Sequence, residues 1–203
     1  MGLFAKVVER VSDHPVLFIF IRGILENDFK AIRRVIRRDL RPGKGLRSLD
    51  LGCGPGAFAD VFLGDDYYGV DLNARYIEHA RRTRRGTFLV SDARKVDLPD
   101  GRFDQILIFG LLHHLSDDVV RAVLKESTRL LAPGGRILAI EDIPAISKLN
   151  LIGHLIHNVE NGEHIRPVEE YRKLYTEEGR RIEKDEVLQS GICDYYAAVL
   201  TRS

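Results

Sequence analysis

The feature that most constrains the fold is a short apolar run that leads directly into a glycine-rich turn. Residues 47–51 read Arg-Ser-Leu-Asp-Leu, and residues 52–56 read Gly-Cys-Gly-Pro-Gly. Glycine lacks a β-carbon and tolerates positive φ, so such a turn lets the backbone approach a ligand closely. A Gly-x-Gly-x-Gly spacing is also compatible with a plain tight turn, so the residues that follow have to decide between the two.

Strand and helix patterns alternate through the rest of the chain. Apolar runs predict strands at 47–51, 67–71, 86–90, 103–109 and 135–141, and amphipathic patterns predict helices at 57–63, 73–83, 117–131 and 167–178. Apolar strands spaced by helices favour an α/β fold with a doubly wound, mostly parallel sheet that helices cover on both faces. The last two strands, at 181–188 and 192–201, are expected to pair antiparallel at one edge.

An arginine-rich helix is predicted before the first strand. Over residues 27–41, apolar side chains share one face and five arginines share the other. Asn27 or Asp28 is expected to cap this helix, and a Pro-Gly pair ends it. Such an arginine face is usually only solvated. The alternative is contact with an acidic substrate or with lipid headgroups. Together with the apolar run at 16–21, it makes peripheral membrane or lipid contact through residues 16–41 a hypothesis.

The length and composition fit one ordinary globular domain of 203 residues. We expect a helical cap over 1–44, a ligand-binding core over 45–141, a helical insert over 142–178 and a β-hairpin over 179–203. The net charge of +1 gives no general reason to expect a nucleic-acid partner. Two cysteines indicate neither a disulfide framework nor a zinc site, and a reducing cytoplasm fits them best.

Polar residues follow successive predicted strands, at the edge where open α/β sheets bind their ligands. The second strand ends in Asp71, whose carboxylate can accept hydrogen bonds from both hydroxyls of a ribose. After the third strand, Asp92 can accept from the exocyclic amine of adenine, and the Ala93 N–H can serve a ring nitrogen. A glycine turn, a ribose acceptor and an adenine acceptor in this order predict a nucleoside site.

These motifs resemble those of the class I S-adenosylmethionine-dependent methyltransferases, in particular the group that acts on small molecules. The resemblance covers residues 45–141. Its motifs are Leu-Asp-Leu-Gly-Cys-Gly-Pro-Gly at 49–56, Gly-Val-Asp-Leu at 69–72, Ser-Asp-Ala at 91–93, Phe-Asp-Gln-Ile at 103–106 and Leu-Ala-Pro-Gly-Gly at 131–135. The resemblance implies a Rossmann-like sheet of seven strands, with the last strand inserted antiparallel between the fifth and the sixth.

The same resemblance implies S-adenosyl-L-methionine as the cofactor. The glycine turn would approach its methionine part, Asp71 would hold the ribose and Asp92 the adenine. The implied cofactor-binding residues are Asp50, Gly52, Cys53, Gly54, Gly56, Asp71, Leu72, Asp92, Ala93 and Gly110. A nicotinamide-dependent oxidoreductase is disfavoured, because the turn is not Gly-x-Gly-x-x-Gly and a pyrophosphate site needs no carboxylate after the third strand.

Two adjacent histidines, His113 and His114, follow the fourth strand, where the family places residues on the acceptor side. Methyl transfer needs donor and acceptor aligned, and a hydroxyl or cationic amine acceptor also needs a base. Imidazole titrates near neutrality, so one of the two is the candidate catalytic base. Adjacent side chains rarely point the same way, and the alternative is that one imidazole only packs in the loop.

The predicted insert carries a further group of polar residues, which we interpret as a lid over the acceptor. They are His157, Glu160, His164 and Arg166. The plain alternative is an exposed helix with no special role. No metal is expected, because an Asn-Gly pair at 161–162 interrupts the histidine spacing and residues 111–115 offer no acid.

A small-molecule acceptor is favoured by the motifs that the chain lacks. No Asn-Pro-Pro-Tyr or Asp-Pro-Pro-Tyr sequence follows the fourth strand, and the chain has no broadly basic character. The apolar run at 16–21 and the arginine face leave room for an amphiphilic acceptor. The remaining alternative is a partner subunit that binds S-adenosylmethionine without transferring methyl groups.

Overall fold

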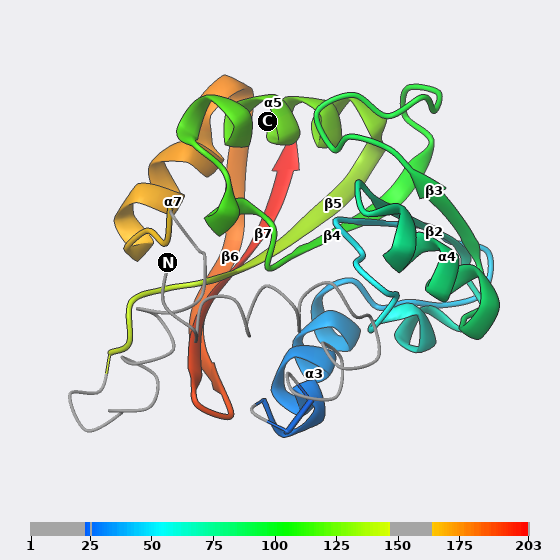
Figure 1. Ribbon diagram of the computed structural model, residues 1–203. Coiled ribbons are helices and arrows are strands. Elements are labelled where there is room, and N and C mark those ends of the chain that lie inside the picture. Colours follow the sequence, from blue (N-terminus) through cyan, green and yellow to red (C-terminus); the bar gives the residue numbers. More distant parts are fainter. Residues whose placement is uncertain (1–22, 25, 147–163, 203) are drawn as a thin grey trace.

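The computed structural model describes residues 23–24, 26–146 and 164–202, which form a seven-stranded sheet with helices (Figure 1). The strands are β1 Arg47–Leu51, β2 Asp66–Asp71, β3 Thr87–Val90, β4 Phe103–Phe109, β5 Leu131–Asp142, β6 Arg180–Ser190 and β7 Cys193–Arg202. Their order is β3-β2-β1-β4-β5-β7-β6, and β7 runs antiparallel to both of its neighbours. The predicted Rossmann-like α/β sheet, with its inserted antiparallel strand, is confirmed.

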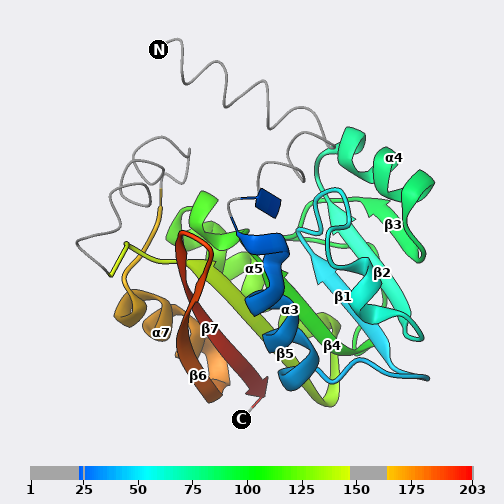
Figure 2. The same ribbon diagram turned by 90° about the horizontal axis from the view of Figure 1, so that it is seen from below.

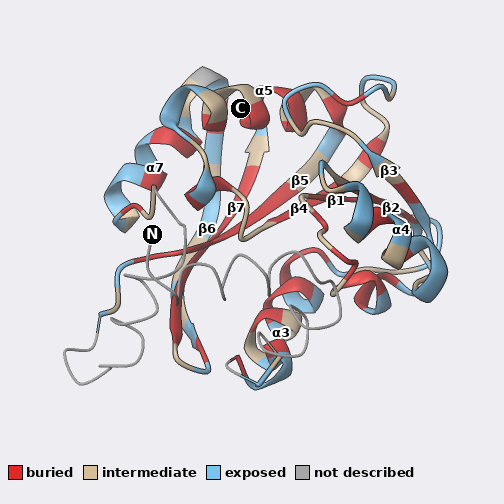
Figure 3. Cartoon of the chain, in the orientation of Figure 1, coloured by how far each residue is buried: buried red, intermediate tan, exposed pale blue. Residues whose placement is uncertain are grey.

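Helices cover both faces of this sheet. Helices α5 Asp117–Leu130 and α7 Val168–Thr176 pack on one face, and α3 Lys30–Asp39 and α4 Ala74–Thr83 pack on the other (Figure 2). The short 3₁₀ turns are η1 Asn27–Phe29, η2 Ala59–Phe62, η3 Leu112–His114 and η4 Glu177–Gly179. The central strands are buried from both sides (Figure 3), which explains why they read as continuous apolar runs.

The structure corrects one predicted helix and the start of one predicted strand. The helix predicted at 57–63 is only the turn η2, because Leu63 is already extended and the chain enters β2 at Asp66. Strand β5 begins at Leu131 instead of residue 135 and continues to Asp142. Asp142 therefore belongs to the sheet and not to the predicted insert.

The helix predicted at 27–41 begins later than expected. Asn27, Asp28 and Phe29 all have left-handed φ, between 52° and 56°, and no side chain caps α3. The Phe29 ring instead packs edge-on against Phe58 and Phe109, with centroids 5.5 and 5.9 Å away. This packing sets where the helix starts, so the predicted capping by Asn27 or Asp28 is wrong.

One further prediction depends on segments beyond the described residues. The division into a cap, a core, an insert and a hairpin stays a prediction, because residues 1–22 and 147–163 lie outside the described residues. Within the described ranges, no helix combines the length and the apolar character that crossing a lipid bilayer requires.

Candidate active site

Strand β1 delivers the chain into the glycine turn at the carboxyl edge of the sheet. The N–H groups of Gly52 and Cys53 both donate to the carbonyl of Val70, at 2.8 and 3.0 Å. Gly52 has a φ of +83°, and a β-carbon there would lie 3.0 Å from the Leu111 side chain. Because Leu111 belongs to the loop after β4, the turn and that loop touch each other. Only glycine fits this contact.

Asp71, the last residue of β2, is bound to the glycine turn. One of its carboxylate oxygens accepts from the Gly54 N–H and the other from the Asn73 N–H, both at 2.8 Å. Burial raises the pKa of Asp71, and these N–H donors oppose that rise. Each oxygen keeps a second lone pair, and the carboxylate is half-buried. Beside it, Leu72 exposes 70% of its surface as an apolar platform.

Asp92 follows β3 at the same edge and is more open. Its side chain is 35% exposed and forms an ion pair with Arg94, with Nη2 and Oδ2 2.6 Å apart. The Arg94 guanidinium holds the pKa of Asp92 below its usual range. Ala93, between these two, is half-buried. A ligand amine at Asp92 would therefore share the carboxylate with a guanidinium.

Two predicted cofactor residues lie beneath the turn with buried side chains. Asp50 is 1% exposed and accepts a hydrogen bond from the Tyr67 hydroxyl at 2.8 Å. Burial raises the pKa of Asp50 to about 7. The Cys53 thiol donates to the Gly54 carbonyl at 3.4 Å, and burial raises its pKa as well. Any ligand contact from Asp50 or Cys53 would have to come through the backbone. Gly56 is buried too.

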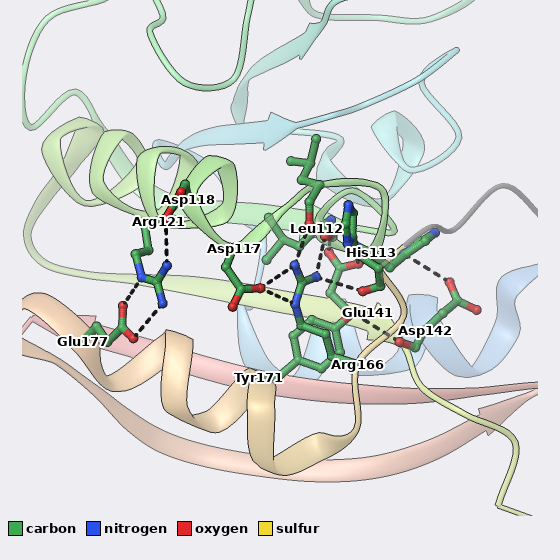
Figure 4. A network of polar contacts seen from close by, with 12 residues as sticks. Leu112, His113, Asp117, Asp118, Arg121, Glu141, Asp142, Arg166, Tyr171 and Glu177 are labelled. Atoms are coloured by element: carbon green, nitrogen blue, oxygen red, sulfur yellow. Dashed lines mark hydrogen bonds and ion pairs between the residues drawn. The ribbon is translucent and has the colours of Figure 1, made fainter.

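A buried carboxylate that we did not predict organises the loop after β4. Glu141, near the end of β5, is fully buried. It accepts hydrogen bonds from the backbone N–H groups of Leu111, Leu112 and His113, at 2.9 to 3.2 Å. It also lies 2.9 Å from the His113 Nδ1 (Figure 4). A carboxylate only accepts, so we assign the proton of the neutral imidazole to Nδ1 and its lone pair to Nε2.

The two candidate base residues differ in their surroundings. His113 is 4% exposed, and its Cε1 would lie 3.6 Å from a β-carbon at Gly110. His114 is exposed, and its ring centroid lies 4.0 Å from that of His113. The Asp142 Oδ2 is 3.6 Å from the His113 Nδ1 and makes no hydrogen bond of its own. Two buried carboxylates therefore lie close to the Nδ1 atom of His113.

Arg166 fastens the same loop from the other side. It is 4% exposed, and its guanidinium donates to the carbonyls of Leu112, His164 and Leu115 at 2.6 to 3.0 Å. It also forms an ion pair with Asp117 at 2.8 Å (Figure 4). These contacts hold residues 112–117 in place. They come from an arginine that we had expected in a lid.

The remaining predicted lid residues divide into two groups. The backbone N–H of His164 donates to the His113 carbonyl at 3.1 Å, which places His164 beside the candidate base. His157 and Glu160 lie outside the described residues. A lid over the acceptor therefore stays a prediction.

Residues 49–135 match the family model of the methyltransferase domain. The ubiquinone biosynthesis O-methyltransferase of Pelagibacter ubique is 31% identical, over 65% of this chain and 59% of its own length. The "Probable tRNA methyltransferase 9B" of Mus musculus is 34% identical, over 52% of this chain and 23% of its own length. A SAM-dependent methyltransferase of Archaeoglobus fulgidus superposes with a TM-score of 0.70 at 20% identity, over 91% and 99% of the two chains. Residues 49–135 therefore carry a methyltransferase domain, and the fold is that of the S-adenosylmethionine-dependent methyltransferases of known structure. The chain spans less than two thirds of the length of these curated relatives.

S-adenosylmethionine is the cofactor of this family, and the residues at the edge suit it. The half-buried Asp71 keeps lone pairs for two ribose hydroxyls, and the exposed Leu72 offers an apolar surface to a flat base. Gly54 has a φ of +52°, and a β-carbon there would meet only Tyr76, at 3.9 Å. The turn is therefore open at Gly54 and leaves room for a ligand.

Glu141 and Asp142 are functional candidates that the methyltransferase motifs do not reveal. Both stand at the carboxyl end of a strand, which is the signal that drew attention to Asp71 and Asp92. Glu141 was already inside the strand predicted at 135–141. Applying the same rule to β5 would have identified it.

Proposed function

We propose that this chain transfers the methyl group of S-adenosylmethionine to a small-molecule acceptor, with His113 as the general base. The observation that carries the proposal is the pair formed by His113 and Glu141 at the carboxyl edge of the sheet. A base within hydrogen-bond reach of an orienting carboxylate is the arrangement expected for proton removal. The Leu111 contact with Gly52 joins this pair to the glycine turn.

The cofactor half of the site binds and orients. When bound, S-adenosylmethionine supplies an activated methyl group on a sulfonium. Asp71 would accept from the ribose hydroxyls, Asp92 from the adenine amine, and Leu72 would cover one face of the base. Fixing these groups places the methyl carbon at a constant position relative to the acceptor, which is the main requirement of in-line transfer.

The acceptor half of the site moves a proton. His113 would take the proton of an acceptor hydroxyl or ammonium at Nε2, so that the acceptor atom gains the electron pair that forms the new bond to carbon. Glu141 accepts a hydrogen bond from the Nδ1–H and stabilises the resulting imidazolium, and the Asp142 carboxylate adds to this stabilisation. Glu141 is thus a positioning residue. General-base assistance of this kind contributes about 10²–10⁴ in rate.

A small molecule is the acceptor that the relatives favour. Similarity to the ubiquinone biosynthesis O-methyltransferase extends over 65% of this chain, whereas similarity to the tRNA methyltransferase extends over 52%. The additional matched length supports the first as the better guide to the substrate class. The names of these two relatives suggest two classes of acceptor, a small molecule and tRNA, and the test compares them.

The acceptor class can be tested with tritium-labelled S-adenosylmethionine. The protein is incubated with a library of small phenols, alcohols and amines in one arm and with bulk unmodified tRNA in the other. We expect label in the organic extract of one or a few small molecules. Label that appears only in tRNA would contradict the proposed acceptor. Absence of S-adenosylhomocysteine binding in calorimetry would contradict the cofactor assignment.

The base can be tested by comparing His113→Gln with His114→Gln. We expect the first to lower kcat by about 100-fold or more while cofactor affinity is unchanged, and the second to keep most of the activity. Glu141→Gln should shift the acid limb of the kcat profile to lower pH, because an amide stabilises imidazolium less than a carboxylate does. Equal losses in the two histidine variants would exclude His113 as the base.

A further inference from the structure

Helix α3 carries its cations in two groups with different surroundings. Arg33 and Arg38 are engaged within the molecule. Arg33 pairs with Asp60, at 2.6 Å, and donates to the Ala57 carbonyl at 2.8 Å. Arg38 pairs with Asp39, at 2.5 Å, and with Glu186 of β6. These contacts attach α3 to its neighbours, so the two arginines have a structural explanation.

The other cations of this segment form a stripe that runs between Arg33 and Arg38 along the exposed side of the helix. Lys30, Arg34, Arg37 and Arg41 are all exposed, and among the described residues none of them has a carboxylate within ion-pair distance. Lys30, Arg34 and Arg37 lie within about 60° of one another on a helix that turns about 100° per residue, and Arg41 follows two residues after the end of α3, with a left-handed φ of 53°. The buried residues Ile32, Val35 and Ile36 face away from them. We call these four residues the cationic stripe.

Charge is concentrated around the stripe. Residues 30–47 contain eight lysines and arginines and a single aspartate, although the whole chain has a net charge of only +1. The remainder of the chain is therefore acidic overall. A positive field confined to one helix face orients the protein toward an anionic partner more effectively than an even distribution would.

A cavity lies at the carboxyl end of the stripe. It has a volume of about 280 Å³, and the guanidinium-bearing side chains of Arg41 and Arg136 line it. Asp104 also lines the cavity, but its carboxylate is bound by Arg47 through contacts of 2.7 and 3.0 Å. This guanidinium lowers the pKa of Asp104. Among the described residues, each of the two arginines makes one hydrogen bond, Arg41 to the Arg38 carbonyl at 3.4 Å and Arg136 to the Asp39 carbonyl at 3.1 Å. Their other N–H groups can donate to a small anion, and the Asp104 carboxylate is already neutralised.

Two exposed aliphatic side chains belong to segments that adjoin residues 30–44 in the sequence or in space. Ile24, six residues before Lys30, is 65% exposed, and Leu63 is 62% exposed. The residue after Leu63, Gly64, lies against the exposed Lys44, because a β-carbon there would be 3.8 Å from the Lys44 backbone nitrogen. Cations combined with exposed aliphatic residues are typical of surfaces that bind the membrane interface.

We propose that the cationic stripe docks this protein on an anionic phospholipid surface, with a headgroup phosphate in the cavity between Arg41 and Arg136. A phospholipid surface suits these residues better than single-stranded nucleic acid, which proteins bind through exposed aromatic platforms. The large hydrophobic side chains that the described residues expose are all aliphatic. The proposal is independent of catalysis, so it can fail without affecting the proposed methyl transfer.

The test is co-sedimentation of the full chain with vesicles of phosphatidylglycerol and phosphatidylcholine, compared with vesicles of phosphatidylcholine alone. The double variant Arg34→Gln/Arg37→Gln should bind the anionic vesicles about 25-fold more weakly, at about fivefold for each cation removed. The matched control is Arg75→Gln/Arg85→Gln, which removes two exposed cations elsewhere on the surface. We expect the control to bind as the unmodified protein does.

Three outcomes would overturn the proposal. Equal losses in the two double variants would mean that only the total charge matters. Equal binding to both kinds of vesicle would mean that anionic lipid is not recognised. Absence of vesicle binding with tight, stripe-dependent binding of duplex RNA would assign the surface to nucleic acid. For the cavity, Arg136→Gln should weaken binding to anionic vesicles by about fivefold, and an unchanged affinity would remove the headgroup site from the proposal.

Discussion

The proposed cofactor half of the site, around Asp71 and Asp92, and the proposed acceptor half, around His113 and Glu141, are built in different ways. Around the cofactor, polar contacts join residues close in sequence: Asp71 binds groups 2 and 17 residues away, and Asp92 binds Arg94. Around the acceptor, Glu141 binds residues 28 to 30 positions away, and Arg166 binds residues up to 54 positions away. One half is assembled from neighbouring loops and the other from distant strands and segments.

The two halves also differ in burial. Asp71 is half-buried and Asp92 is 35% exposed, whereas Glu141 is fully buried and Arg166 is 4% exposed. An exposed group that loses its hydrogen-bond partner can bind water instead, at little cost in free energy, whereas a buried group cannot. We therefore expect changes in the cofactor half to affect binding and changes in the acceptor half to affect stability.

Replacement of Glu141 should give the largest effect. Glu141→Ala leaves three backbone N–H groups and the His113 Nδ1 without their acceptor. At about 1–3 kcal/mol for each buried unsatisfied group, the free energy of unfolding should fall by about 5 kcal/mol. Urea unfolding followed by circular dichroism measures this. The control, Asp92→Ala, should unfold as the unmodified protein does, and similar losses for both variants would remove the distinction between the halves.

Asp50 sharpens the comparison, because it is the deeply buried carboxyl of the cofactor half. Its pKa is raised to about 7, so between about pH 4 and 7 the folded state keeps a proton that the unfolded state releases. Stability should be highest below this range and fall as the pH rises through it. A shift of about three pKa units corresponds to about 4 kcal/mol.

The measurement for Asp50 is urea unfolding of the protein without cofactor at a series of pH values. Asp50→Asn cannot ionise, so the difference between its curve and that of the unmodified protein isolates this group. The difference should grow steadily from about pH 4 to 7. A difference that does not change with pH would mean that Asp50 titrates normally despite its burial.

Local patterns were enough to predict the strands and the turn that carry the proposed cofactor half. Strands β1 to β4, the glycine turn, Asp71 and Asp92 follow from apolar runs, turn residues and carboxylates within short stretches of the chain. The contacts that complete this half are equally local, such as the Gly54 N–H on Asp71. The predicted antiparallel last strand also came true, through the family resemblance.

Long-range packing explains what the sequence patterns missed. The start of α3 is set by the Phe29 ring on Phe58 and Phe109, which no capping rule contains. The position of Arg166 depends on carbonyl groups 51 and 54 residues earlier in the chain. Such contacts exist only once the strands have assembled. The residue type of Arg166 alone could therefore not show whether its side chain is buried against the loop after β4 or belongs to a lid.

Asp71→Ala should weaken the cofactor half without destabilising the fold to the same degree. The variant loses two hydrogen bonds from ribose to a charged acceptor, so the affinity for S-adenosylhomocysteine should fall by about 3 kcal/mol. Isothermal titration calorimetry measures this. Asp71→Asn keeps one acceptor oxygen, so its affinity for S-adenosylhomocysteine should lie between that of Asp71→Ala and that of the unmodified protein. If affinity is unchanged in both variants, the ribose is not bound at the end of β2.

Asp92→Ala should give the smallest effect, because the carboxylate is 35% exposed and already shared with Arg94. We expect a loss of about 1 kcal/mol in the affinity for S-adenosylhomocysteine, the usual contribution of one hydrogen bond. An analogue without the exocyclic amine supplies the control, since it should bind the variant and the unmodified protein equally well. Arg94→Ala removes the competing guanidinium and should tighten the binding of the normal ligand. If the analogue also loses affinity in Asp92→Ala, the carboxylate shapes the loop after β3 instead of reading the amine, and the cofactor half depends on buried structure as the acceptor half does.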